Sequence, residues 1–131
     1  MKRRYHKDVH YICKLSGIKK IEKVYGKLKN YDVVLTDERK KHIIERRGKD
    51  ARKVLDNLSK TIKEYDYVFI GNSGCIKYVK KINDIYLLVV KLSLQNSNKG
   101  NSILTGMIVD KRRINRLIAR DKLIDKKHDI I

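Results

Sequence analysis

The chain has 131 residues, with 33 Lys and Arg against 15 Asp and Glu, so its formal net charge at pH 7 is +18. This length allows one domain with its own core and excludes a two-domain enzyme with a separate cofactor-binding fold. The apolar content of 41% excludes a disordered basic tail, and no apolar run approaches the roughly 20 residues of a membrane-spanning helix. The excess of positive charge predicts a polyanionic partner, with nucleic acid first among the candidates.

The first thirty residues are predicted to form a basic arm that contains a β-hairpin. Apolar and polar residues alternate over residues 9–15, Ser16-Gly17 offers a turn, and residues 18–25 return as a second strand. No Pro-rich or low-complexity linker interrupts the chain. We therefore expect a single domain of residues 1–131, with the arm at residues 1–30 and a core at residues 31–125.

Two helices are predicted to follow the arm. The first begins at Thr36-Asp37, whose side-chain oxygens can cap free amides, and ends at Gly48. The second carries apolar residues at helical spacing from Ala51 to Ile62 along one face.

Four strands and a final helix are predicted for the rest of the chain. The strands are separated by turn-forming Gly, Asn, Ser and Asp residues or by a polar loop, which indicates an antiparallel meander. They cover Tyr67–Ile70, Cys75–Ile82, Ile85–Ser93 and Ser102–Asp110, and the basic helix covers Lys111–Arg120. The fold class is therefore α+β: a four-stranded antiparallel sheet packed by two preceding helices, with an N-terminal hairpin and a basic C-terminal helix.

Cysteine usage and tyrosine content add two smaller expectations. Cys13 and Cys75 lack the CxxC spacing of a metal or redox motif, so we expect free buried thiols and a cytoplasmic protein. Four tyrosines around the predicted strands could stack on unpaired bases, although strand tyrosines usually pack in a core. We expect one base-stacking residue among Tyr65, Tyr67, Tyr78 and Tyr86.

Several segments resemble, in this order, the phage and mobile-element nuclease domains grouped with barnase, EndoU, the colicin tRNases and RelE. They are VVLTDERKKHIIERRG, the strands YVFI, CIKYVKKI and YLLVVKLS, and NSILTGMIVDKRRINRL, within about residues 30–125. The resemblance implies metal-independent ribonuclease activity on a small α+β fold, often as a toxin or effector. Members commonly have Arg-His where this chain has Arg46-Arg47, so Arg47 departs from the pattern. His42 is then the only histidine in the region of resemblance.

The first predicted helix carries the candidate proton-transfer residues. Metal-free RNA cleavage needs a base for the ribose 2′-hydroxyl, an acid for the leaving 5′-oxygen and fixed cations around the phosphorane. His42, Glu45 and Arg46 are three and four positions apart and therefore lie on one helix face. The residues alone favour a solvated helix face, on which Glu45 forms ion pairs, over a catalytic one. The family resemblance favours the catalytic interpretation for His42 and Arg46.

Three residues of the predicted strands complete the candidate catalytic set. Lys91 follows a strongly apolar strand, where an ammonium group is costly unless it reaches a cleft or snorkels to water. Ser102 and Thr105 could donate to phosphate or ribose, but a spacing of three places them on opposite faces of a strand unless it bends at Gly106. Ordinary strand hydroxyls remain the alternative for both.

Basic residues elsewhere are expected to hold the nucleic-acid backbone rather than read its bases. A solvated charged face is the alternative for any single one of them. The expected set is Arg39, Arg47, Lys81, Arg112, Arg113, Arg116 and Arg120.

No metal site and no cofactor are expected. His6, Asp8 and His10 lie in a predicted strand without an obvious further ligand. The sequence thus favours a small metal-independent endoribonuclease of toxin or effector type. Its expected partners are RNA and an acidic antitoxin or immunity protein, without a membrane. The alternative is a catalytically inactive nucleic-acid-binding accessory protein of a phage or mobile element.

Overall fold

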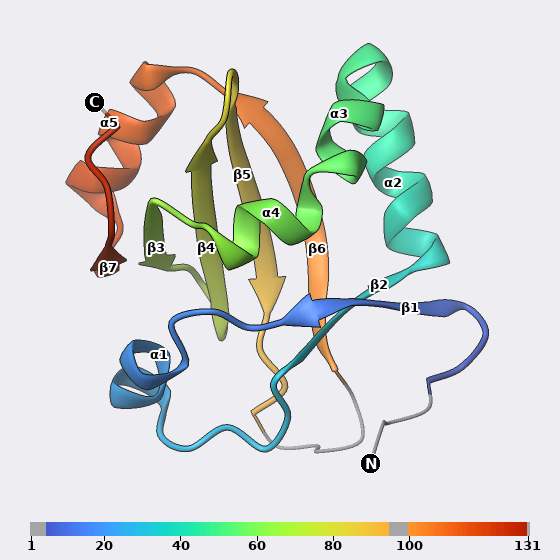
Figure 1. Cartoon of the computed structure of the whole chain (residues 1–131), viewed down its shortest axis with the longest axis horizontal. Coiled ribbons are helices and arrows are strands. Elements are labelled where there is room, and N and C mark those ends of the chain that lie inside the picture. The colour runs from blue at the N-terminus through green and yellow to red at the C-terminus, as the bar shows by residue number, and fades with distance from the viewer. Residues whose placement is uncertain (1–4, 95–99, 131) are drawn as a thin grey trace.

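A computed structural model describes residues 5–94 and 100–130, and it arranges them around a seven-stranded mixed sheet (Figure 1). Neighbouring strands are antiparallel except for one parallel pair, β2 and β6. Across the sheet the order is β1 (Val9–Lys14), β2 (Asp32–Thr36), β6 (Asn101–Val109), β5 (Ile85–Lys91), β4 (Cys75–Lys81), β3 (Tyr67–Ile70) and β7 (Leu123–Lys126).

The helices lie between and beside these strands. They are α1 (Ile18–Tyr25), α2 (Asp37–Arg47), α3 (Ala51–Asp56), α4 (Leu58–Lys63) and α5 (Lys111–Arg120), with a 3-10 turn at Gly48–Asp50. As predicted, the Thr36 hydroxyl caps α2 by accepting from the Arg39 amide at 3.1 Å, and α2 ends at Gly48, where φ is 52°. The predicted second helix is interrupted at Asn57, which separates α3 from α4.

The α+β class and the central meander are confirmed. β3, β4, β5 and β6 are consecutive antiparallel neighbours, and their bounds agree with the predicted strands to within two residues. The prediction of a four-stranded sheet is wrong, because β1, β2 and β7 extend it on both sides and make it mixed. β7 was missed because its apolar residues are few, and its pairing with β3 arises from tertiary contact.

The predicted N-terminal hairpin is also wrong. Residues 18–25 form α1, whose Ile21 is fully buried in the core, and β1 pairs with β2 in place of a second hairpin strand. Gly17 turns the chain from β1 into α1 with φ 73°, a left-handed conformation that glycine adopts readily. Ile18, Ile21 and Tyr25 are spaced by three and four, so helical periodicity was present beside the strand-like pattern. The arm's first four residues lie outside the described residues.

The two faces of the sheet bury separate apolar clusters. On one face, α4 crosses the strands and α3 packs beside β6, and together they bury Val54 and Ile62 against Leu88 and Ile103 (Figure 1). On the other face, α5 buries Ile114 and Leu117 against residues of β3, β4 and β5. The four candidate stacking tyrosines are at most 4% exposed, so the base-stacking role is wrong and all of them pack in these cores.

A glycine on β6 provides a stability prediction. A Cβ atom at Gly106 would lie 2.6 Å from Leu88 Cδ2 and 2.7 Å from Val54 Cγ1. Gly106→Ala is therefore expected to lower the free energy of unfolding by about 1–3 kcal/mol, because β6 and α3 must separate to admit the methyl group. Urea unfolding followed by circular dichroism measures this change. An unchanged midpoint would contradict the close approach of α3 to β6.

Both cysteines are free and buried, as the sequence predicted. Burial raises the pKa of the Cys13 thiol, so less of it is thiolate at a given pH than for an ordinary cysteine. In a Cys75→Ser variant, we expect Cys13 to react with a thiol-specific dye at pH 8 only after urea is added. Full labelling of the folded protein at the rate of a free thiol would contradict the buried position.

Within residues 5–94 and 100–130, no helix has the length and apolar content needed to cross a membrane.

Candidate active site

A β-bulge determines which face of β6 carries the candidate hydroxyls. Lys91 of β5 lies opposite Ser102 and Val89 lies opposite Thr105, with the register shifting by one residue between these pairs. Directly paired residues share a face, and Lys91 and Val89 share one because they are two positions apart. Ser102, Thr105 and Lys91 therefore lie on the same face of the sheet, and the bend occurs before Gly106, where the extra residue is Leu104.

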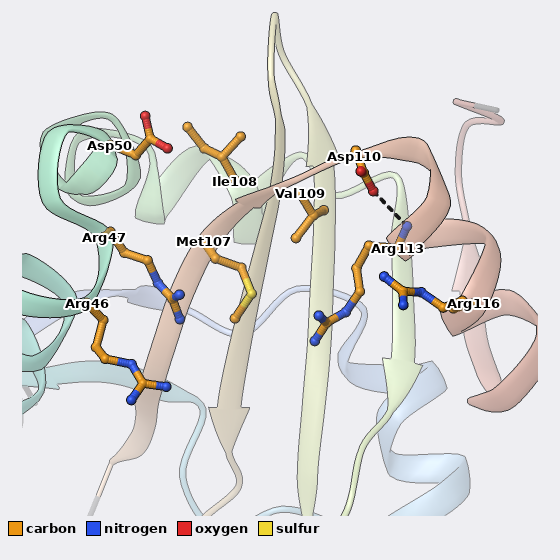
Figure 2. A pocket seen from close by; sticks show the side chains of 9 residues that line it. All are labelled: Arg46, Arg47, Asp50, Met107, Ile108, Val109, Asp110, Arg113 and Arg116. Carbon is orange, nitrogen blue, oxygen red and sulfur yellow. Dashed lines mark hydrogen bonds between the residues drawn. The ribbon is translucent and has the colours of Figure 1, made fainter.

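That face carries a pocket of about 390 Å³ between α2 and α5 (Figure 2). Arg46 and Arg47 extend into it from the end of α2, and Arg113 and Arg116 extend toward them from α5. The floor includes Met107 and other residues at the end of β6. We call this site the arginine pocket; it is lined by Arg46, Arg47, Asp50, Met107, Ile108, Val109, Asp110, Arg113 and Arg116.

Arg47 joins α2 to β6. Its Nε donates to the Gly106 carbonyl at 2.8 Å, and its terminal nitrogen donates to the Thr105 hydroxyl at 3.0 Å. Burial lowers the pKa of Arg47, and the neighbouring charges of Arg46 and Arg113 lower it further. Three guanidiniums from the two helices are therefore close enough to repel one another. A bound anion would relieve this repulsion.

The two carboxylates of the arginine pocket leave much of this charge uncompensated. Asp110 caps α5 by accepting from the Arg113 amide at 2.9 Å. In the part of the chain that the structure describes, no ion pair within 4 Å joins Asp50 or Asp110 to any of the four arginines. A cluster of like charges without such pairs, two of them half-buried (Arg47 and Arg113) and two exposed (Arg46 and Arg116), is typical of a site for a polyanion.

His42 and Glu45 line a second pocket, of about 260 Å³, on α2. Its other lining residues are Glu38, Arg39 and Lys41. Glu45 pairs with Lys41 at 4.0 Å, and among the described residues no hydrogen bond joins His42 to Glu45. The structure thus separates two candidate proton-transfer residues from the arginine pocket, although His42 precedes Arg46 by one turn of the same helix.

Lys91 lies at the end of β5, is exposed, and donates to the Ser73 carbonyl. It shares the sheet face of the arginine pocket without lining it. The other predicted backbone-binding residues divide between the pockets and the surface. Arg47, Arg113 and Arg116 line the arginine pocket, Arg39 lines the second pocket, and Lys81, Arg112 and Arg120 are exposed and line neither.

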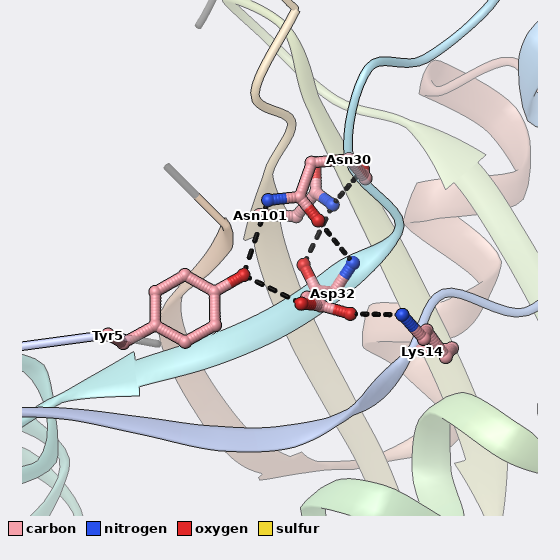
Figure 3. A network of polar contacts seen from close by, with 5 residues as sticks. All are labelled: Tyr5, Lys14, Asn30, Asp32 and Asn101. Carbon is pink, nitrogen blue, oxygen red and sulfur yellow. Dashed lines mark hydrogen bonds and ion pairs between the residues drawn. The ribbon is translucent and has the colours of Figure 1, made fainter. Parts of the chain in front are cut away.

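A buried polar network supports the opposite end of this face (Figure 3). Asn101 is fully buried; its amide nitrogen donates to the carbonyls of Asn30 and Asp32 at 2.8 and 2.9 Å, and its oxygen accepts from the Ser93 amide at 2.8 Å. The Asp32 carboxylate accepts from Tyr5 at 2.8 Å and from Lys14 at 2.5 Å. The hydrogen bond to Asp32 raises the pKa of Lys14.

Asn101 is a residue that the sequence analysis did not select, although it begins the NSI.T segment. It joins β2 to β6 at the only parallel pair of the described sheet and immediately precedes Ser102. The position of an Asn at the start of a strongly apolar strand could have indicated its burial, because buried side-chain amides occur where backbone groups need hydrogen-bond partners.

Potential metal ligands do not gather within residues 5–94 and 100–130: no three His, Cys, Asp or Glu side chains are placed to share an ion. His10 instead contacts Asp37 at the start of α2, with Nε2 and Oδ1 2.5 Å apart.

A family model described as phage-Barnase-EndoU-ColicinE5/D-RelE like nuclease3 matches residues 10–107. This confirms the resemblance found in the sequence and moves its start back to β1, so His10 as well as His42 falls in the matched range. The range contains Arg46 and Arg47 and ends before α5. Searches of curated proteins and of solved structures found no match.

Proposed function

Because the chain belongs to the phage Barnase-EndoU-ColicinE5/D-RelE-like nuclease 3 family, we propose that it is a metal-independent endoribonuclease acting on RNA at the arginine pocket. One observation carries this proposal: two helices direct four guanidiniums over a sheet face that also presents Thr105 and Ser102. Guanidiniums fixed around a phosphate supply the positive charge that a pentacoordinate phosphorane needs.

The proposed reaction is an internal transesterification. The ribose 2′-oxygen attacks the adjacent phosphorus, the bond from phosphorus to the 5′-oxygen breaks, and a 2′,3′-cyclic phosphate forms. The 2′-hydroxyl loses a proton and the departing 5′-oxygen gains one. Arg46 and Arg47 contact the phosphate oxygens, and Thr105 donates to the phosphate or ribose while Arg47 fixes its hydroxyl.

His42 is the proposed proton-transfer residue. It lies one helical turn before Arg46, so a ribose attached to the phosphate at Arg46 would extend toward it. An imidazole can both accept a proton and return it. Glu45 lines the same pocket as His42 and is proposed to assist it. Lys91 and Ser102 are proposed to hold the RNA farther along the same sheet face.

The decisive experiment incubates the purified protein with a synthetic single-stranded RNA and with total RNA in the presence of EDTA. We expect cleavage that leaves 2′,3′-cyclic phosphate ends, and loss of cleavage in His42→Ala. His6→Ala is the matched control, since His6 is exposed and lines neither pocket. Cleavage that requires a divalent metal or leaves 5′-phosphate ends would refute the mechanism.

A second candidate function is RNA binding without catalysis. The observation that favours it is the position of His42 and Glu45 outside the arginine pocket, together with Arg47 where related domains commonly have His. RNA binding without cleavage, unchanged by His42→Ala, would establish this alternative.

The active enzyme is proposed to act as a toxin or effector. An acidic antitoxin or immunity protein would complement the arginine pocket in charge. Growth arrest on expression of the chain, relieved by His42→Ala, is the expected result. Normal growth under wild-type expression that yields active nuclease would contradict the toxin role.

A further inference from the structure

The α5 side of the arginine pocket contains an unused donor. The Arg113 Nε atom is buried and has no hydrogen-bond partner among the described residues. A buried guanidinium nitrogen without a partner is costly, so its position calls for an acceptor that the described residues do not provide. The guanidinium points into the space between α5 and α2, toward Arg46 and Arg47 (Figure 2).

The charge of the arginine pocket exceeds what one phosphodiester neutralises. Its lining residues carry four guanidiniums and two carboxylates, which leaves an excess of two positive charges. One phosphodiester brings a single negative charge, and two consecutive phosphodiesters bring two. The pocket volume of about 390 Å³ falls within the range of sites that hold a whole small ligand, so it has room for more than a lone phosphate group.

The four arginines divide into two pairs on separate elements. Arg46 and Arg47 belong to α2, and Arg47 is fixed to β6 through Gly106 and Thr105. Arg113 and Arg116 belong to α5, whose position follows from its Asp110 cap and from the burial of Ile114 and Leu117. Two arginine pairs that face each other across one pocket, on two separately anchored helices, can each engage a different phosphate.

We propose that the arginine pocket holds two consecutive phosphates of a single strand, one at Arg46 and Arg47 and the neighbouring one at Arg113 and Arg116. This inference rests on the proposed function, because it identifies the pocket's ligand as a polynucleotide strand with two adjacent phosphodiesters. The family match ends at residue 107, so it assigns no role to the α5 pair.

The test uses trinucleotides with 2′-O-methyl groups, which cannot undergo attack by the 2′-oxygen. One ligand has two phosphodiesters, and in two others either linkage is replaced by an uncharged methylphosphonate. Binding is measured by calorimetry at low salt. In the wild-type protein each neutral linkage is expected to raise Kd by about tenfold, as expected for the loss of charge-assisted hydrogen bonds.

The variants should separate the two linkages. In Arg113→Gln and in Arg116→Gln, neutralising one particular linkage should change Kd by less than about twofold, while the other linkage keeps its full effect. In Arg46→Gln the pattern should be reversed. Lys111→Gln is the matched control, because it removes one charge from α5 at an exposed residue outside the pocket. It should retain the full effect of both linkages.

Three outcomes would overturn the two-phosphate site. They are no effect of either neutral linkage on the Kd of the wild type, no measurable binding of the trinucleotide, or, in every variant, an equal reduction in the effects that the two neutral linkages have on Kd. The proposed ribonuclease function is tested separately by cleavage in EDTA. Linkage-specific binding in a protein that does not cleave RNA would support this inference and remove the catalytic proposal. Cleavage without linkage-specific binding would do the opposite.

Discussion

Arg46→Gln is expected to lower kcat/KM for RNA cleavage by about a hundredfold, the typical cost of removing one fixed donor from a charged transition state. Arg46 is exposed, lines the arginine pocket and lies one turn after His42, so the loss should fall on the reaction rather than on folding. Steady-state cleavage of a fluorescent single-stranded RNA measures the rate. The urea midpoint of the variant should equal that of the wild type.

Arg52→Gln provides the matched control for charge. The Arg52 side chain is 90% exposed, lies on α3 outside the pocket and pairs with Asp56 on the next turn of that helix, 3.6 Å away. Its substitution removes the same charge from the protein but at a distance from the pocket. We therefore expect kcat/KM to change by less than about twofold, through a long-range electrostatic effect that added salt screens. Equal losses in both variants would assign the effect to net charge and contradict the role of Arg46.

Asn101→Ala is expected to lower the free energy of unfolding by about 2–4 kcal/mol, because one substitution removes two buried hydrogen bonds and one partly buried hydrogen bond. The Asn101 side chain bonds the carbonyls of Asn30 and Asp32 and the amide of Ser93, and alanine offers none of these three groups a hydrogen bond. Urea unfolding with an unchanged m-value measures the loss. The neighbouring Ser102 should also lose its fixed position, so cleavage should fall in the folded variant.

Asn115→Ala is the control for that substitution. Asn115 is exposed on α5, so removing its amide should change the free energy of unfolding by less than about 0.5 kcal/mol. If Asn101→Ala is no more destabilising than Asn115→Ala, the network does not hold β2 against β6.

The central part of the fold was predictable from local patterns. Turn residues and apolar runs defined the strands from Tyr67 to Val109, and the Thr36 cap and Gly48 defined α2. The outer strands were not predictable in this way, because they depend on partners distant in sequence. β7 is half-exposed and becomes a strand through its pairing with β3. The Tyr65 hydroxyl also holds it by donating a hydrogen bond to the Asp125 carboxylate at 2.5 Å.

The sequence predicted which kinds of residue form the candidate site better than it predicted how they are arranged. The sequence indicated an arginine-rich phosphate site, but helical spacing alone grouped Arg46 with His42 and Glu45. The structure groups Arg46 with Arg113 and Arg116, because β6 carries α5 to the opposite side of the pocket from α2. The shared face of Ser102 and Thr105 was hidden for a similar reason: no single-strand pattern reveals a bulge.

The parallel pairing of β2 with β6 governs the order in which the pocket can assemble during folding. β3 to β6 form a meander of sequence neighbours, and α5 follows β6 directly, so these parts need only short loops to close. The pairing of Val34 with Ser102 and the bonds from Arg47 to Gly106 and Thr105 close a much longer loop that encloses the meander. A chain that has folded only its meander therefore possesses the Arg113 and Arg116 half of the site, and the two halves face each other only after the last long-range contacts form.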